Sequence, residues 1–233
     1  MRKYHDFLLH SASDLNAFLG CAHAAALNLR KLRDPASLPD RATDEEGAKL
    51  IQDAGHKHEA AYLEHLKQLG DVAEVTASGS LEHRATATMV AMREGSEIVY
   101  QAAFLDQPWH GFVDFLRRVE TPSALGSWSY EAVDTKLARA AKASHVLQLG
   151  LYSDLIAEVQ GARPQAMHIV LGDGTCGCSR PPASYYRSSR RPRGVGSTRI
   201  STTGRRTIRP IRSPICPFST GSPAAACRCA TMS

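Results

Sequence analysis

The chain has 233 residues, of which 43% are hydrophobic and 22% charged, an ordinary composition for a globular protein with a sizeable core. No apolar run approaches the ~20 residues that a membrane span needs, and the first residues lack the apolar segment of a secretory signal, so we expect a cytoplasmic protein without a membrane partner. The net charge of +5 is unevenly divided: residues 1–173 carry 17 basic and 23 acidic side chains, whereas the last sixty residues carry eleven Arg and no Asp, Glu or Lys. The basic charge therefore belongs to a separate segment and does not characterise the folded part.

Three stretches within the first 93 residues have the apolar spacing of helices. Ser11 and Asp14 stand at capping-box spacing where the first helix begins, and a Pro-containing stretch ends that helix. The second helix carries an apolar stripe, which consists of Leu50, Ile51, Ala54, His58, Ala61, Tyr62 and Leu66. In chain order this part predicts helices at 11–33 and about 44–69, a short strand at 72–76, and a helix at 81–93.

Three strand-like runs follow, each short, alternating or apolar, and each bounded by turn residues. They lie at 97–105, 109–119 and 128–136. Apolar residues at every fourth position predict a helix over about 141–160, and a buried strand is expected at 165–171. Helices, three strands, a helix and a further strand predict an α/β fold with a mixed central sheet flanked by helices.

The segment from 175 to 233 has a different composition, dominated by Arg, Ser, Pro, Gly and Thr, with no helical or strand period. Such a composition predicts a disordered or non-native tail, so we expect the folded domain to span residues 1–174. The complete lack of acidic residues and lysine suggests, as a hypothesis, translation of GC-rich DNA in a shifted frame. An Arg-rich arm that contacts nucleic acid is the alternative, although its only aromatic residues are Tyr185, Tyr186 and Phe218.

Two of the predicted strands carry the residues that indicate chemistry. The strand period of two places Asp134 and Lys136 on one face, and Asp114 lies on the preceding strand, which we expect to be its neighbour. Two carboxylates brought together repel each other unless a hard cation lies between them, and Mg²⁺ or Mn²⁺ prefers such oxygen ligands. This set predicts metal-assisted attack of water on a phosphodiester, with Lys136 orienting the water or stabilising the transition state.

Gln148 and Tyr152 are one turn apart on the helix that follows, so their polar ends share one face. We expect Tyr152 to be anchored by the apolar stripe while its hydroxyl reaches the site or the substrate. Both could also be ordinary helix residues, although we favour the functional role.

These motifs have a familiar order. Gly111-Phe-Val-Asp114, Asp134-Thr-Lys136 and Gln148-Leu-Gly-Leu-Tyr152 resemble the signature of the RecB-type branch of the PD-(D/E)XK nuclease superfamily, which is Gly-x-x-Asp, Asp/Glu-x-Lys, Gln-x-x-x-Tyr. Gly55-His-Lys-His58-Glu59 is similar to the histidine motif of those nucleases. The resemblance covers about residues 8–174 and is strong because four motifs occur in order.

The resemblance implies a restriction-endonuclease-like core that hydrolyses DNA with Mg²⁺ or Mn²⁺, in repair or recombination, together with a helicase region or motor partner. Asp114 and Asp134 would bind the metal, with His58 as an additional ligand. Lys136 would be the catalytic lysine, and the Gln–Tyr pair would support the site and the strand being cut.

The chain also departs from this family. Many RecB-type nucleases hold an iron–sulfur cluster on four cysteines, and Cys21 could be the first, but the cysteines after residue 174 do not have the spacing of the other three, so no cluster is expected. Cys21 is more readily interpreted as a small buried residue. We expect two glutamates near the motifs, Glu59 and Glu131, to face solvent. Nothing in the sequence resembles the family's C-terminal portion or its helicase region, so we expect a truncated or frame-shifted copy.

Structural interpretations of the same residues stay open. Asp114 and Asp134 could be solvent-facing carboxylates, although their apolar neighbours argue against two such exposures. Lys136 could be only a salt-bridge partner, and His58 an ordinary helix histidine. The alternatives to a nuclease are therefore a catalytically inactive DNA-binding module and a non-functional fragment of a nuclease-helicase.

Overall fold

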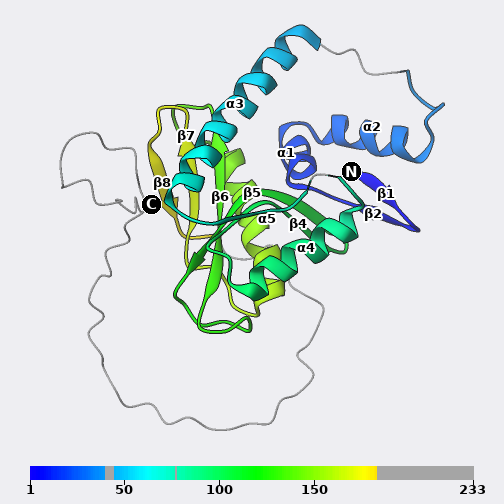
Figure 1. Ribbon diagram of the computed structural model, residues 1–233. Coiled ribbons are helices and arrows are strands. Elements are labelled where there is room, and N and C mark those ends of the chain that lie inside the picture. The colour runs from blue at the N-terminus through cyan, green and yellow to red at the C-terminus, as the bar shows by residue number, and fades with distance from the viewer. Residues whose placement is uncertain (40–44, 77, 183–233) are drawn as a thin grey trace.

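The computed structural model describes residues 1–39, 45–76 and 78–182 (Figure 1). Its elements in chain order are β1 (Arg2–Tyr4), β2 (Phe7–Leu9), α1 (Ala12–Gly20), α2 (Ala22–Arg33), α3 (Glu45–Leu69), β3 (Val72–Glu74), α4 (Leu81–Glu94), β4 (Ile98–Asp106), β5 (Trp109–Val119), β6 (Ser129–Lys136), α5 (Ala143–Gln160), β7 (Met167–Leu171) and β8 (Cys176–Ser179). β1 and β2 form a hairpin, and the other six strands form one sheet in the order β3-β4-β5-β6-β7-β8. Two neighbouring pairs, β3–β4 and β6–β7, are parallel and the others are antiparallel. The predicted mixed sheet is confirmed.

Helices cover both faces of this sheet (Figure 1). Leu149 and Ile156 of α5 share one buried apolar cluster with Ala132 of β6, whereas Leu63 of α3 shares another with Val133. Because successive residues of a strand point to opposite faces, α5 and α3 lie on opposite sides of β6. The predicted α/β architecture, with helices flanking a mixed sheet, is therefore confirmed.

The helix predicted over 11–33 is wrong in one respect, because the chain forms two helices there. Asp14 caps the first one as expected, since its Oδ2 accepts hydrogen bonds from the N–H and the hydroxyl of Ser11 at 2.8 and 2.7 Å. Cys21 then adopts an extended backbone with φ −159°, and its Sγ accepts from the N–H of Ala24 at 3.4 Å, which starts α2. Cys21 is exposed rather than buried, because this capping role keeps it at the corner between the helices.

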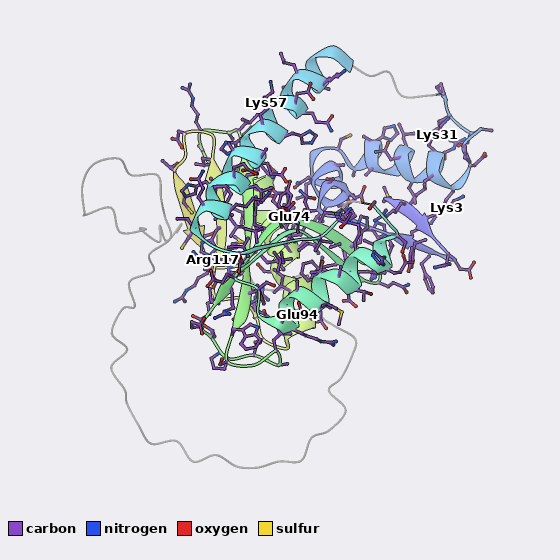
Figure 2. The ribbon with its side chains drawn as sticks, viewed as in Figure 1. Lys3, Lys31, Lys57, Glu74, Glu94 and Arg117 are labelled. Carbon is purple, nitrogen blue, oxygen red and sulfur yellow. The ribbon has the colours of Figure 1, made fainter. Side chains whose placement is uncertain are left out.

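The apolar stripe of α3 is only partly buried. Leu63 and Leu66, in its second half, pack against the sheet, whereas Leu50 and Ile51 are 73% and 70% exposed. The first half of the helix extends beyond the sheet (Figure 1), so its apolar residues have no sheet to cover. Charged residues such as Lys57 on α3 and Lys3 on β1 extend into solvent (Figure 2).

The sheet continues past residue 174, where the sequence predicts the domain to end. Cys176 to Ser179 form β8, which pairs antiparallel with β7 from Val170↔Cys176 to Met167↔Ser179. A turn connects the two strands, with Gly174 at φ +79° and the N–H of Leu171 bonded to the carbonyl of Thr175 at 2.9 Å. β8 is too short and too polar to show a sequence period, and its backbone ladder with β7 holds it instead. The remainder of the predicted tail, residues 183–233, lies outside the described residues.

Candidate active site

The predicted aspartates meet where two strands separate. The last backbone pair between β5 and β6 is Phe115↔Val133, and the next positions along the same register are Asp114 and Asp134. Residues that face each other across two antiparallel strands have side chains on the same face, so the two carboxyl groups are neighbours. Asp134 is completely buried, and Asp114 is half-buried.

Thr135 fixes the first carboxylate. Its backbone N–H and its hydroxyl both donate to Oδ2 of Asp114, at 2.9 and 3.0 Å. Sequence reasoning did not single out Thr135, although it stands between the two functional residues of Asp134-Thr-Lys136. A hydroxyl at the central position of that motif is the signal that could have identified it.

The electrostatics of Asp134 show how closely the charges are placed. Burial raises the pKa of Asp134 to about 7, and the charge of Asp114 adds to this shift, while the Lys136 ammonium opposes it. Oδ2 of Asp134 accepts no hydrogen bond of ordinary geometry in the described residues, but the ammonium of Lys136 lies against it as an ion pair. We favour the ion pair as the physical interaction, because unlike charges in contact attract regardless of the donor angle.

The Gln–Tyr pair of α5 lies beside Asp134. Nε2 of Gln148 donates to Oδ1 of Asp134 at 3.0 Å and lies 3.1 Å from the hydroxyl of Tyr152. Burial, with the charges of Asp134 and Asp114, raises the pKa of Tyr152, so its hydroxyl stays protonated. Gly111 makes this packing possible, because a Cβ there would lie 3.0 Å from the Tyr152 ring.

His58 is placed differently from the aspartates. It is half-buried on α3, and its Nε2 lies 3.5 Å from the carbonyl oxygen of Val170 on β7. Within residues 1–39, 45–76 and 78–182, no three His, Cys, Asp or Glu side chains form a group that could hold a metal ion. Of the predicted ligands Asp114, Asp134 and His58, the structure thus brings together the two aspartates and leaves the histidine apart.

Another carboxylate that sequence reasoning missed, Glu59 of α3, is joined to β4 by a hydrogen bond. Glu59 was expected to face solvent but is half-buried and accepts a hydrogen bond from the side chain of Gln101. Gln101 occupies the β4 position opposite Asp114 and has a left-handed backbone with φ +56°. Burial raises the pKa of Tyr100 to about 12, with smaller contributions from the charges of Glu59 and Asp114. A strained non-glycine residue beside a candidate site is typical of functional positions.

Glu131 was also expected to face solvent, and that expectation is wrong. It is 5% exposed, and Oε2 lies 2.7 Å from Nε2 of His168 and 3.2 Å from Nη2 of Arg117, while Oε1 accepts from the N–H of Ala166 at 2.9 Å. Burial raises the pKa of Glu131, but the hydrogen bond and charge of His168 and the charge of Arg117 outweigh it, so the pKa is lowered. This carboxylate is fully paired and points away from Asp134.

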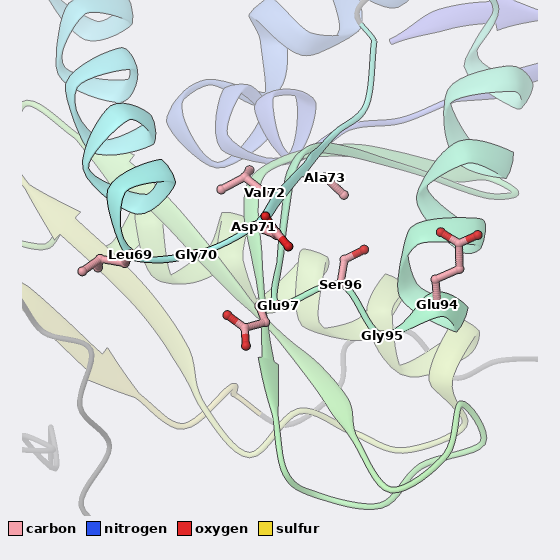
Figure 3. A pocket seen from close by; sticks show the side chains of 9 residues that line it. All are labelled: Leu69, Gly70, Asp71, Val72, Ala73, Glu94, Gly95, Ser96 and Glu97. Atoms are coloured by element: carbon pink, nitrogen blue, oxygen red, sulfur yellow. The ribbon is translucent and has the colours of Figure 1, made fainter.

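A hollow of about 700 Å³ lies elsewhere, at the beginning of β3 and β4 (Figure 3). Its lining includes Asp71, Glu94, Gly95 and Glu97. Asp114 lies opposite Gln101, further along β4, so this hollow is separate from the aspartate pair. We therefore place the chemistry at the aspartates rather than in this hollow.

Comparisons with known proteins add no family: no protein-family model matches the chain, and no curated protein matches it. Among the described helices, none combines the length and the apolar character needed to cross a membrane. The geometry of the site therefore carries the functional argument.

Proposed function

We propose that the chain is a metal-dependent nuclease of the RecB-like PD-(D/E)XK type, which hydrolyses DNA phosphodiester bonds. The observation that carries this proposal is the contact of Asp134 with Lys136 and Gln148, next to Asp114 at the point where β5 and β6 separate. Two carboxylates, a lysine and an amide in this order and geometry fit metal-assisted phosphodiester hydrolysis. A restriction-endonuclease-like core and a role in repair or recombination with a helicase or motor partner are part of the same proposal.

The donor set fits a hard divalent cation. Burial and the charge of nearby Asp114 both raise the pKa of Asp134, so it costs free energy to ionise both carboxyl groups. A cation between the two carboxylates would offset that cost. Asp114 and Asp134 would hold Mg²⁺ or Mn²⁺, which complete their coordination with water and phosphate oxygens. Such an ion supplies Lewis-acid stabilisation of the charge that develops on the phosphate.

The protein side chains have separate tasks. In the reaction a water oxygen bonds to phosphorus and gives up a proton to solvent, while an ester P–O bond breaks and the leaving oxygen takes up a proton. Negative charge grows on the phosphate and on the leaving oxygen in the transition state. Lys136 is 25% exposed on its side chain, so its ammonium can contact both Asp134 and the substrate, orient the water and stabilise that charge. Gln148 orients Asp134, and Thr135 orients Asp114, which keeps both carboxylates in place.

One observation favours a second candidate, a DNA-binding module without catalysis. His58 lies apart from the aspartates, so the described residues supply two protein carboxylates and no third ligand in contact with them. A site with only two such ligands binds a cation more weakly than one with three. A catalytic assay separates the two candidates.

The assay incubates labelled single- and double-stranded DNA with the full chain in Mg²⁺, Mn²⁺ or EDTA. We expect cleavage that needs the metal and falls at least about a hundredfold in Lys136→Ala, because a positioned charge at the reacting phosphate is lost. Lys67→Ala is the matched control, since Lys67 ion-pairs on the surface with Glu64 and Glu74 and should leave the rate unchanged. DNA retention without metal-dependent cleavage would instead support the binding module.

A further inference from the structure

A group of basic side chains lies beside the aspartate site on the next part of the sheet. Arg2 of β1 and Arg84 of α4 both lie against the ring of Phe112 on β5, with their Cζ atoms 5.7 and 4.3 Å from the ring centroid. His110 is the third basic group, and its Nδ1 lies 3.3 Å from Nη2 of Arg2. Two guanidinium groups therefore converge on one aromatic ring.

These two arginines differ from other arginines of the sheet and its helices. Arg117, Arg118 and Arg163 each form an ion pair with a carboxylate, namely Glu131, Glu120 and Asp154. In the part of the chain that the structure describes, neither Arg2 nor Arg84 has such a partner. The Nε atoms of both are buried and donate no hydrogen bond; Nε of Arg117 shares this property, so the missing ion pair is what sets Arg2 and Arg84 apart.

The local electrostatics are unfavourable without an anion. Burial and the charge of Arg2 lower the pKa of Arg84, so the two guanidinium groups act on each other as like charges. Burial and the charge of Arg2 also lower the pKa of His110 to about 4, so the imidazole is neutral and accepts from Arg2 without compensating its charge. Desolvated positive charges without a counter-charge are costly, and a guanidinium fork matches the oxygens of a phosphate.

The two arginines lie near the strand positions that carry the aspartate site. Nη2 of Arg84 donates to the carbonyl oxygen of Gln101 at 3.4 Å, and Gln101 lies opposite Asp114 in the register of β4 and β5. Phe112 precedes Asp114 by two residues on β5, which is roughly 7 Å along a strand. That is of the order of the separation between neighbouring phosphates on one nucleic-acid strand.

We propose that Arg2 and Arg84, placed over Phe112, form a phosphate-binding site for the nucleic-acid strand whose neighbouring phosphodiester is held at Asp114 and Asp134. The inference rests on the proposed nuclease function and adds to it a residue pair that sets how the strand is aligned. The anion recognised is a phosphate group with two or more free oxygens. A backbone phosphodiester, with one negative charge and two free oxygens, accepts hydrogen bonds from the guanidinium groups and offsets part of their combined charge.

The test is binding of a fluorescein-labelled single-stranded oligonucleotide to the full chain in EDTA, followed by anisotropy at several salt concentrations. We expect Arg2→Gln and Arg84→Gln each to weaken binding about tenfold or more, and to reduce the slope of log affinity against log salt by about 1. Arg93→Gln is the matched control, because Arg93 lies on the same helix as Arg84 and is exposed; it should stay within about twofold of the unmodified chain. Equal affinities for the Arg84 and Arg93 variants would overturn the proposal.

A second measurement covers the case in which a variant does not fold. In the unmodified chain, inorganic phosphate should displace the oligonucleotide more effectively than chloride at the same ionic strength, and Arg84→Lys should keep part of the affinity because it keeps the charge and loses the fork. Displacement that depends on ionic strength alone overturns the site. The binding assay needs no catalysis, so the two proposals can fail separately. Binding that depends on Arg2 and Arg84, without metal-dependent cleavage, refutes the nuclease and supports the anion site. Metal-dependent cleavage with binding that does not depend on these arginines supports the nuclease and refutes the anion site.

Discussion

Gly111 lies directly against the ring of Tyr152, so closely that a Cβ on Gly111 would be 3.0 Å from Cε1 of that ring and 3.0 Å from Cδ1 of Leu155. This contact sets the distance between β5, which carries Asp114, and α5, which carries Gln148. The glycine of the Gly-x-x-Asp motif is thereby explained by packing: any side chain there would move the helix that holds Asp134 in place.

Gly111→Ala should therefore disturb the site as well as the packing. We expect a loss of stability of about 1–3 kcal/mol, because an added methyl group in a filled core forces its neighbours apart. Thermal and chemical unfolding would measure it. Gly55→Ala is the control, since nothing lies within 4 Å of a Cβ at Gly55 and alanine favours a helix, so that variant should be neutral or slightly stabilised.

Asp134→Asn should change how stability depends on pH. Burial and Asp114 raise the pKa of Asp134 in the folded protein to about 7, above its value near 4 in the unfolded chain. The stability that Asp134 contributes to the fold is therefore fully present below about pH 4 and is lost as the pH rises through about 7. The asparagine keeps an oxygen for Gln148 and carries no charge, so we expect the metal-free variant to be more stable than the original chain at pH 8, by about 1–3 kcal/mol, and similar at pH 4. Urea unfolding in EDTA at several pH values measures the difference; a gap independent of pH would contradict this account of the site.

Tyr152→Phe removes one hydroxyl and keeps the ring that packs on Gly111. The hydroxyl lies 3.1 Å from Nε2 of Gln148, so its loss should cost only about 0.5–1.5 kcal/mol of stability. We expect a larger effect on kcat than on KM, because Gln148 would orient Asp134 less firmly in the transition state. Single-turnover cleavage assays distinguish this from a purely structural role, which would leave kcat unchanged.

The left-handed backbone of Gln101 on β4 can be tested by substitution. Gln101 has φ +56°, a conformation that costs most residues about 1 kcal/mol and glycine almost nothing. Both Gln101→Gly and Gln101→Ala lose the hydrogen bond to Glu59, so the comparison between them isolates the backbone. We expect the glycine variant to be the more stable of the two by about 1 kcal/mol in chemical denaturation. The reverse order would show that this backbone conformation carries no strain.

Much of this site could be predicted because its parts are local in the sequence. The alternation around Asp134 and Lys136, and the four-residue spacing of Gln148 and Tyr152, specify faces of a strand and a helix without knowledge of the rest of the fold. β5 occupies the residues 109–119 that its pattern predicts, since turn residues mark its beginning.

The missed features depend on tertiary contacts. The contact of Glu59 with Gln101 joins residues that are 42 positions apart, and the positive φ of Gln101 has no sequence signal comparable to a glycine. Arg2 and Arg84 look like ordinary surface charges in the sequence, because only the fold shows that they share one ring and lack carboxylates. Cys21 separates two helices by its backbone conformation, which apolar spacing does not record.

The central claim is that Asp114 and Asp134 together bind a divalent cation. The most direct measurement is a titration of the full chain with Mn²⁺, followed by electron paramagnetic resonance of the free ion at pH 8. We predict saturable binding that is lost in Asp114→Asn and in Asp134→Asn and is unchanged in Glu94→Gln, whose exposed carboxylate lies by the separate hollow (Figure 3). Mn²⁺ binding that is the same in all four proteins, or absent from the unmodified chain, would contradict the account.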